Sequence, residues 1–274
     1  MRKKYRTDEM TAEDQQHVLA IPVLATYGEE DSFALPAEEQ VDELPLIALR
    51  NMSIFPGTLV PILVGRKKSM QVIRQAEKDN KYFGVVTQRD AGIEDPKLED
   101  LYTVGTVVEV SQIIELPSGE ISAILRGRQR FTLESLTQED PYLSGKIKLL
   151  DDTSIGESTE EEFKALTDLI HERTLGFLEK IAPSAPAGFL ETIRSVKNRA
   201  YIIHLSASLL QVSTEVRQEM LEAEDLSVRG LRVLAQLQAH IQESDIKESI
   251  LSRTRQEMDQ QQREYFLQQQ MRTI

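Results

Sequence analysis

The sequence predicts an α+β protein: a curled, mostly antiparallel β domain of the open-barrel kind, followed by an α-helical bundle and one long projecting helix. Residues 44–150 hold β-branched runs that Pro and Gly separate, which is typical of short strands joined by turns. Residues 151–274 contain few Gly and space their apolar side chains as helices do. A chain of 274 residues is long enough for about two domains with cores of their own.

The charge is spread unevenly along the chain. The net charge is −13, from 32 Lys and Arg against 45 Asp and Glu, yet residues 44–150 carry 14 basic and 13 acidic side chains. Residues 1–43 carry 4 basic and 11 acidic side chains without a regular apolar period, so we expect a disordered extension there. The predicted division is 1–43 (acidic extension), 44–152 (β domain), 153–225 (helical bundle) and 226–274 (long helix).

The composition excludes several classes of protein. A negative net charge works against a duplex nucleic acid or an anionic membrane as the main partner. The chain has no Cys, so disulfides, thiolate metal sites and thiol nucleophiles are excluded, which suits a reducing compartment. The sequence shows neither a signal peptide nor a run of roughly 18 apolar residues, and we expect a soluble, cytoplasmic protein.

Alternating apolar and polar side chains mark the strands of the β domain. Tyr142–Leu149 alternates well and is predicted to be a half-buried strand. Glu120–Gly127 repeats the pattern, and the turn signal Pro117-Ser118-Gly119 joins it to Thr106–Leu116 in a hairpin. Further strands are predicted at Leu44–Leu49, Leu59–Val64 and Tyr82–Thr87, and a helix with a narrow apolar stripe at Lys68–Asn80.

A capping box opens the helical region, with Ser158 as the N-cap and Glu161 three positions later. The first helix ends before Pro183 and Pro186, because proline cannot continue a helix. Further helices are predicted at about 188–195, 198–210 and 214–223, which gives a small bundle with short connections.

One long helix is predicted from Ser227 to Ile274, a stretch without Pro and with Gly230 as its single Gly. At 1.5 Å per residue it is about 70 Å long, so it must project from a compact domain. Its apolar side chains follow an interrupted heptad pattern, which favours pairing between chains. The absence of a stop signal at its end indicates a truncated chain or a cleavage product. The predicted inter-subunit residues are Leu237, Ile241, Leu251, Met258, Tyr265 and Phe266.

Catalytic motifs are missing from the sequence. The Gly145-Lys146 pair lacks the earlier Gly of a P-loop, and no GxSxG or GxGxxG pattern occurs. His171-Glu172 begins like a zinc motif, but Leu175 stands where the second His is needed. His204 is interpreted as an ordinary helix residue, and Asp151-Asp152 as helix-capping carboxylates. We therefore predict no catalytic, cofactor-binding or metal-binding residue, and no enzyme activity of this chain alone.

One basic segment stands out, Arg126-Gly127-Arg128-Gln129-Arg130, at a predicted strand junction with Lys146 and Lys148 on a nearby strand. It has the charge to bind phosphate or RNA. No aromatic side chains for base stacking are interleaved with the arginines, which argues against RNA. The alternative, which we favour, is that Gly127 forms a bulge or tight turn while the arginines are solvated or pair with nearby acids.

Several blocks of the sequence occur together in one order. They are LPLIALR at 44–50, FPG at 55–57, LVPI at 59–62, VGR at 64–66 with Ser69, DLYTVGTV at 100–107, LPSG at 116–119 and QREYFLQQQM at 262–271. This set resembles the N-terminal region of the Lon protease family: its opening motif, its next segments, and the neck that runs into the ATPase domain. The resemblance covers most of residues 44–274.

The resemblance implies a PUA-like β domain, a helical bundle and a long helix that recognise substrates and assemble a hexameric, ATP-dependent serine protease. Its clients would be unfolded or misfolded proteins, and the chain alone would form a dimer or a weaker assembly. ATP, Mg²⁺ and the Ser–Lys dyad would belong to absent downstream domains, because nothing here matches the family's nucleotide loop or dyad. The acidic residues 1–43 and the basic Arg126-Gly127-Arg128 depart from the family pattern.

A client-binding surface is predicted around the apolar segment that follows the first strand. Unfolded clients expose apolar side chains and need a complementary apolar surface, to which adaptable Met contributes. The predicted residues are Met52, Phe55, Pro56, Ile62 and Leu63. For Phe55 and Ile62, burial in the core is the favoured alternative. A different function also stays open, a free-standing PUA-like regulator that binds RNA or a small ligand through Arg126–Arg130.

Overall fold

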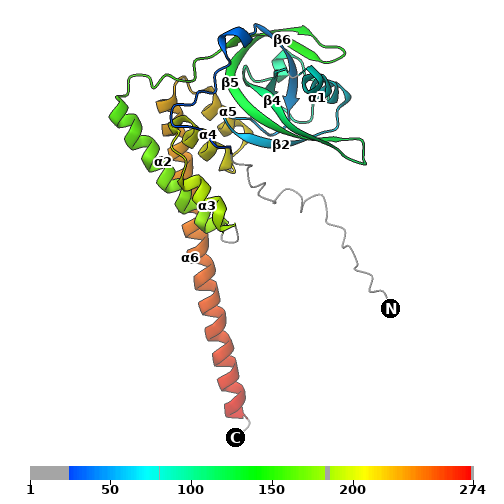
Figure 1. Ribbon diagram of the computed structural model, residues 1–274. Helices are drawn as coiled ribbons and strands as arrows, with labels where there is room; N and C mark the ends of the chain where they lie inside the picture. Colours follow the sequence, from blue (N-terminus) through cyan, green and yellow to red (C-terminus); the bar gives the residue numbers. More distant parts are fainter. Residues whose placement is uncertain (1–24, 80, 183–185, 273–274) are drawn as a thin grey trace.

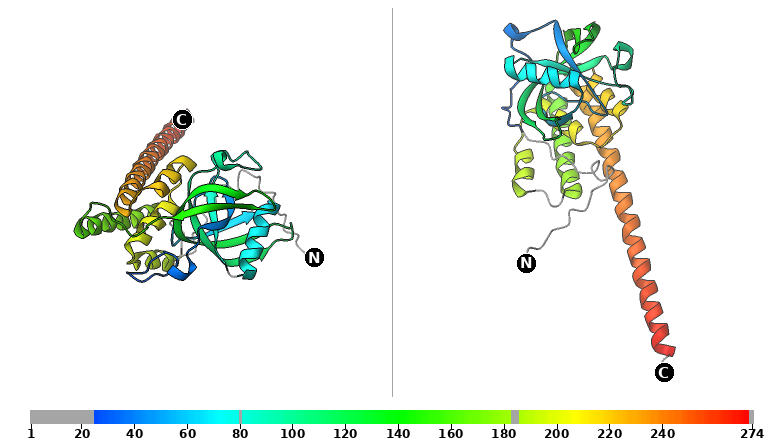
Figure 2. Two further views of the ribbon diagram at one scale, coloured as in Figure 1. Left: turned by 90° about the horizontal axis from the view of Figure 1, so that it is seen from above. Right: turned by 90° about the vertical axis from the view of Figure 1, so that its right-hand side faces the viewer.

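A curved sheet and a bundle of helices lie side by side, and one helix extends far beyond both (Figures 1 and 2). This arrangement is seen in a computed structural model that describes residues 25–79, 81–182 and 186–272, with the backbone alone for Ala187 and residues 265–272. The long helix, α6, runs from Leu226 to Arg272. The predicted α+β class is confirmed.

The β domain is one six-stranded sheet with the strand order β2-β5-β4-β3-β1-β6. Strand β5 also pairs with β6, so the hydrogen-bonded strands form a ring that starts and ends at β5. All neighbours are antiparallel except β1 and β3, which confirms a mostly antiparallel, curled sheet. The strands are β1 (Glu43–Leu49), β2 (Leu59–Val64), β3 (Phe83–Thr87), β4 (Val104–Glu115), β5 (Ile121–Gln138) and β6 (Leu143–Leu149).

Strand β5 has 18 residues and is more than twice as long as the sequence predicts. Its side chains alternate between buried and partly exposed from Ile121 to Gln129, so the strand passes through Gly127 without a junction. The first part of β5 pairs with β2 and the second part with β6, while β4 pairs along both. The predicted strand end at Gly127 is therefore wrong, because the alternation continues beyond it.

Gly127 lies where β5 passes very close to the loop between β1 and β2. A register shift, which marks a bulge, begins at Gly127 in its pairing with β4. Gly127 N–H donates to the carbonyl of Thr58, and Gly57 N–H donates to that of Gly127, both at 2.9 Å. A Cβ at position 127 would lie 2.2 Å from the carbonyl oxygen of Phe55, so this approach requires glycine. The predicted bulge is confirmed.

Helix α1 (Lys67–Asp79) packs against β1 and β4, and its buried residues are Ser69, Val72, Ile73 and Ala76. It begins one residue before the predicted helix, whose last residue, Asn80, lies outside the described part of the chain. The bundle consists of α2 (Glu160–Ile181), α3 (Ala187–Arg194), α4 (Arg199–Leu209), α5 (Thr214–Glu222) and the first part of α6. Two short 3-10 segments, η2 (Ala37–Glu39) and η3 (Leu98–Asp100), complete the described elements.

The N-cap of α2 is Thr159, not the predicted Ser158. Thr159 Oγ1 accepts the N–H of Glu162 at 3.2 Å, and the Glu162 carboxylate accepts the N–H of Thr159 at 2.9 Å. Both sequence pairs have the spacing of a capping box, so the sequence alone did not distinguish them. The structure moves the predicted cap by one residue.

The β domain and the helical bundle share a core. Phe55, in the loop between β1 and β2, is 0% exposed and belongs to the same apolar cluster as Phe163 and Phe177 of α2. In addition, Gln218 of α5 donates from Nε2 to the carbonyl of Val104 at the start of β4 (2.8 Å). At the predicted boundary near residue 152 the secondary structure therefore changes from strands to helices, but the β domain and the helical bundle stay packed against each other.

Residues 25–42 lie against the bundle and the sheet. Phe33 is buried against α4, and Asn198 Nδ2 at the start of α4 donates to the carbonyl of Asp31 at 2.9 Å. Leu35 is buried in the sheet core, and its N–H donates to the side chain of Gln129. The predicted disorder of the acidic extension is therefore wrong for residues 25–43, since apolar side chains anchor them; residues 1–24 lie outside the described part.

Candidate functional site

Three of the predicted client-binding residues line one hollow beside β2. Met52, Ile62 and Leu63 border a hollow of about 500 Å³, together with Leu49 and Val64. Leu63 is 62% exposed and Met52 is half-buried, whereas Ile62 is only 6% exposed. The accessible apolar surface of this hollow is therefore formed mainly by Leu63, Pro61 and Met52.

Phe55 and Pro56 do not belong to this surface, because both are buried. Phe55 fills the core between the sheet and the bundle. The hydroxyl of Thr58, three residues later, donates to the carbonyl of Phe55 at 2.7 Å. The prediction that Phe55, Pro56 and Ile62 present a surface to clients is therefore wrong for this structure. For Phe55 and Ile62 the alternative interpretation, core packing, is correct.

The predicted inter-subunit residues of α6 divide in the same way. Leu237 is 1% exposed and Ile241 is partly buried, because this part of α6 packs in the core of the bundle. The assignment of Leu237 to a contact between chains is therefore wrong, whereas Ile241 keeps part of its surface exposed and its assignment stays a prediction. Leu251 and Met258 are 63% and 58% exposed on the projecting part. The side chains of Tyr265 and Phe266 lie outside the described residues.

Sequence reasoning missed two exposed apolar residues of α6, Ile246 and Ile250. They precede Leu251 and Met258 on the projecting part, where neighbouring side chains are exposed. The heptad pattern used for the prediction includes Leu237 but neither Ile246 nor Ile250. Their spacing of four residues nevertheless places both on one face of the helix. Among the described residues, the projecting part of α6 thus exposes four large apolar side chains, Ile246, Ile250, Leu251 and Met258. This part of the helix extends away from the bundle (Figure 2).

The basic segment of β5 is occupied by contacts within the chain. Arg126 and Arg128 both reach the carboxylate of Glu109 on β4, at 3.6 and 3.7 Å. Arg130 is buried and forms an ion pair with Asp152. The favoured interpretation, that these arginines pair with nearby acids, is confirmed.

A buried charge cluster joins Arg130 and Asp152 to the bundle through Arg229 of α6 and His204 of α4. Arg229 donates to Asp152 Oδ1 (3.4 Å) and to His204 Nε2 (2.7 Å). Burial, and then the cations of Arg229 and Arg130, hold the pKa of His204 well below its ordinary value of 6.5. Burial, followed by Arg130, lowers the pKa of Arg229 to about 10, so it stays cationic at neutral pH.

This cluster corrects two sequence interpretations. Asp152 does not cap a helix but serves as the common carboxylate of two buried arginines, Arg130 and Arg229. His204 is a fully buried hydrogen-bond acceptor and not an ordinary helix residue. No local pattern indicates either role, because the four partners come from distant parts of the chain.

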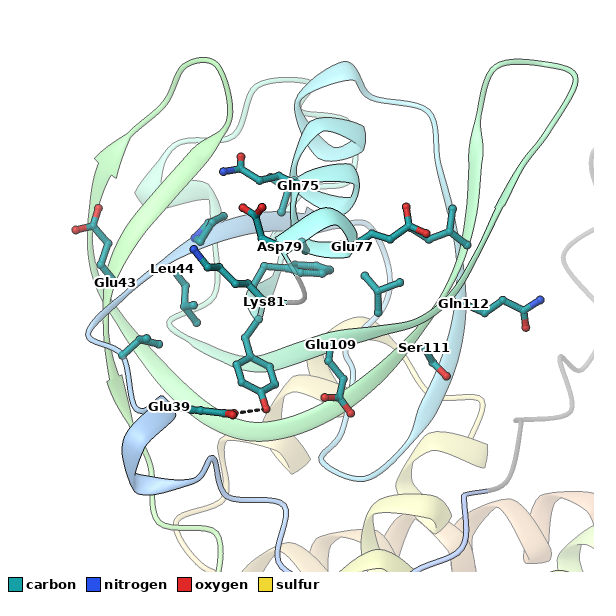
Figure 3. A pocket seen from close by; sticks show the side chains of 18 residues that line it. Glu39, Glu43, Leu44, Gln75, Glu77, Asp79, Lys81, Glu109, Ser111 and Gln112 are labelled. Carbon is teal, nitrogen blue, oxygen red and sulfur yellow. Dashed lines mark hydrogen bonds between the residues drawn. The ribbon is translucent and has the colours of Figure 1, made fainter.

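A groove of about 600 Å³ lies between β1, the end of α1 and the second half of β4 (Figure 3). Its apolar lining includes the buried side chains of Val72, Ala76 and Phe83, to which Val110 and Ile113 add partly buried surface. Its acidic lining consists of Glu39, Glu43, Glu77, Asp79 and Glu109, and Lys81 is the one basic residue among the lining residues.

Most of the groove's acids are exposed, and one of them, Glu43, accepts a hydrogen bond from the hydroxyl of Thr137 at 2.5 Å. Glu39, Glu43, Glu77 and Asp79 are exposed, and none makes a salt bridge with another described residue. Tyr82 donates to Glu39 at 2.6 Å; burial, and then this hydrogen bond, raise the pKa of Tyr82 to about 12. The groove therefore combines an apolar floor with a negative rim.

The sequence contained one signal for this groove, the unequal lengths of β3 and β4. Strand β3 has 5 residues and β4 has 12, so β3 cannot pair along the whole of β4. The last residue pair that joins β3 to β4 is Phe83 with Val108. A search for residue motifs missed the groove because its acids come from four separate elements and loops.

The described residues offer neither a metal site nor a membrane-spanning helix. They contain no group of three or more His, Asp or Glu side chains placed to hold a metal ion. Within the same residues, no helix combines the length and the apolar character needed to cross a membrane.

Comparison with known proteins gives consistent matches. The model of the ATP-dependent protease La (LON) substrate-binding domain matches residues 43–239. The Lon protease of Porphyromonas gingivalis is 41% identical over 262 residues, which is 96% of this chain and 31% of that protein. The Lon protease of Parabacteroides distasonis is 39% identical over 256 residues, 93% of this chain and 31% of that protein. The chain thus spans about a third of these curated relatives.

Two solved structures show the same fold. The N-terminal domain of a Mycobacterium avium complex Lon protease matches with a TM-score of 0.58 and 17% identity, covering 72% of this chain and 99% of that one. A Lon N-terminal domain protein from Xanthomonas campestris matches with a TM-score of 0.50 and 21% identity, covering 71% and 98%.

Proposed function

Because the chain belongs to the Lon protease family through its substrate-binding domain, we propose that it recognises protein substrates for an ATP-dependent serine protease of which it is a part. The observation that carries this proposal is the family match over residues 43–239, which includes the whole sheet and most of the bundle. The exposed hollow and the acidic groove lie within that range or at its edge.

Unfolded and misfolded proteins are the proposed clients. The hollow beside β2 offers exposed Leu63 and half-buried Met52, and apolar surface of this kind complements the apolar side chains that an unfolded chain exposes. Met adapts its shape to different partners, which suits a site that must accept many sequences.

The proposed assembly role belongs to the projecting part of α6. Its exposed Ile246, Ile250, Leu251 and Met258 have no packing partner among the described residues, and a paired helix would cover them. We propose self-association of this chain through α6, as a dimer or a weaker assembly, within a hexameric full-length protein.

The chemistry of the protease would belong to other domains of the cytoplasmic full-length protein. This chain's sequence offers no P-loop for ATP and Mg²⁺ and no residues that match the family's Ser–Lys dyad, so it would act by binding and not by catalysis. As part of the same proposal, the curled sheet is of the PUA-like kind. The pairing of β5 with β6 closes its strands into a ring, whereas the sequence predicts an open barrel. RNA binding through Arg126–Arg130 is disfavoured because these side chains contact Glu109 and Asp152.

The client proposal is tested with the purified chain and labelled α-lactalbumin, either native or reduced and carboxymethylated so that it stays unfolded. Unfolded α-lactalbumin should bind more tightly than the native form by fluorescence anisotropy. A variant with Met52→Ser and Leu63→Ser should weaken this binding by about tenfold, since two apolar side chains lose their contacts.

The matched control is Leu98→Ser, which removes an exposed apolar side chain from η3, away from the hollow. It should leave binding unchanged. Absence of any binding to unfolded α-lactalbumin would refute client recognition. Unaltered binding by the double variant would refute only its placement at Met52 and Leu63.

A further inference from the structure

The edge of strand β4 is open where it lines the acidic groove. The pairing of β3 with β4 ends at Phe83 and Val108, and no described strand pairs with Glu109–Glu115 on that side. On the other side these residues pair with β5. A strand edge of this kind presents unpaired N–H and C=O groups, to which another extended chain can bind.

The groove follows this edge along its length. Five consecutive residues of β4, from Glu109 to Ile113, line the groove. A strand that turns one face towards a hollow contributes alternate residues, because successive side chains point to opposite faces. A run of five consecutive residues therefore places the strand edge itself in the groove. The run is about 17 Å long, enough for an extended segment of about five residues.

The surroundings of the edge favour one kind of segment. Glu39, Glu43, Glu77 and Asp79 add four exposed carboxylates, whereas Lys81 is the one lining cation. Glu109 is already paired with Arg126 and Arg128, so it adds less negative charge to the rim than the four exposed acids do. A negative rim attracts a basic segment and repels an acidic one. The apolar floor, which includes Val72, accepts the intervening apolar side chains.

We propose that this groove binds an extended segment of an unfolded polypeptide, in which basic and apolar residues alternate, as an added strand on the free edge of β4. The inference rests on the proposed client recognition and names the substrate class. Hydrogen bonds to the main chain give binding that depends little on sequence, and the acidic rim selects the charge. This mode suits a domain that receives many different unfolded chains.

The test uses the purified 274-residue chain and a labelled nine-residue peptide of alternating Lys and Val. Binding is measured by fluorescence anisotropy, and amide hydrogen exchange is followed over Glu109–Ile113. The peptide should bind and slow exchange in this segment. The same peptide methylated on every second backbone nitrogen keeps its side chains and their charges but loses about half its backbone N–H donors. It should bind at least about tenfold more weakly. A Glu–Val peptide should not bind.

The variant Glu77→Gln with Asp79→Asn removes two charges from the rim of the groove. It should weaken binding of the Lys–Val peptide by about tenfold at low salt. The matched control is Glu257→Gln with Asp259→Asn, the same pair of residue types at the same spacing on the exposed part of α6. The control should stay within about twofold of the parent chain.

Each other outcome overturns the inference in a recognisable way. Equal binding of the methylated peptide without slowed exchange over Glu109–Ile113 refutes strand addition, while retained binding of unfolded α-lactalbumin leaves client recognition standing. Protection of Glu109–Ile113 that grows with protein concentration and needs no peptide assigns the edge to a second copy of this chain. If neither the peptide nor unfolded α-lactalbumin binds, client recognition and the groove proposal both fail.

Discussion

Arg130 and Asp152 pair through both the main chain and the side chain. The N–H of Arg130 donates to Asp152 Oδ2 at 2.8 Å, and its guanidinium donates to Oδ1. The same guanidinium donates to the carbonyls of Leu221 and Ala223, at 2.7 and 2.8 Å. Because β5, the segment after β6 and the end of α5 meet at this pair, it fixes the sheet against the helical bundle.

Replacement of Asp152 should destabilise the protein strongly. Asp152→Asn leaves both Arg130 and Arg229 buried without their carboxylate, and an uncompensated buried charge costs about 3–5 kcal/mol. Urea unfolding followed by circular dichroism measures the loss. Asp151→Asn, at the exposed neighbouring carboxylate, should cost less than about 1 kcal/mol. A similar small cost for both variants would contradict the role of Asp152.

His204 should make the folded state sensitive to mild acid. Its pKa lies well below 6.5 in the folded protein, so below pH 6.5 the unfolded state binds a proton that the folded state does not. The free energy of unfolding should then fall by about 1.4 kcal/mol per pH unit as the pH drops from 6.5 towards the folded pKa. Urea unfolding at pH 7.5, 6.5 and 5.5 measures this slope.

The contribution of His204 is isolated with a variant that cannot titrate. His204→Gln keeps an acceptor for Arg229, and it should reduce the slope between pH 6.5 and 5.5. The control is His171→Gln, which removes an imidazole that is only half-buried and should change this slope less than His204→Gln does. An unchanged slope in His204→Gln would refute the assignment.

Local patterns predicted the secondary structure well, since the alternation at Tyr142–Leu149 and the helical spacing beyond residue 160 reflect one buried face. The same patterns did not predict which apolar loop residues are buried. Phe55 stands in a loop without periodicity, and its burial depends on the bundle, which begins about a hundred residues later. Tertiary packing of this kind leaves no local signal.

The candidate sites were less predictable than the fold. The acidic groove arises because β3 is shorter than its partner β4, and because α1, which packs against β1 and β4, lies beside the gap. Its carboxylates, such as Glu39 and Glu77, come from distant positions and are ordinary surface acids when viewed in the sequence. Ring closure through β5 and β6 is a non-local event that periodicity does not reveal.

Two glycine substitutions should change stability in opposite directions. Gly127→Ala places a Cβ 2.2 Å from the carbonyl oxygen of Phe55, and forced overpacking costs about 1–3 kcal/mol. Gly176 is exposed inside α2, and an added Cβ meets nothing within 4 Å. Gly176→Ala should therefore stabilise by about 0.5–1 kcal/mol, through helix propensity. Thermal unfolding should show a lower Tm for the first and a higher Tm for the second; the same sign for both would contradict the structure.

Self-association should depend on the exposed apolar residues of α6. Changing Ile246, Ile250, Leu251 and Met258 to Gln removes apolar surface that a paired helix would bury, at about 1 kcal/mol or more per side chain. Association should weaken at least about a hundredfold, with unchanged helix content by circular dichroism. Sedimentation equilibrium at high micromolar concentration measures the mass. Leu231→Gln, equally exposed but beside the bundle, should have no effect, and a parent chain that stays monomeric would refute pairing through α6.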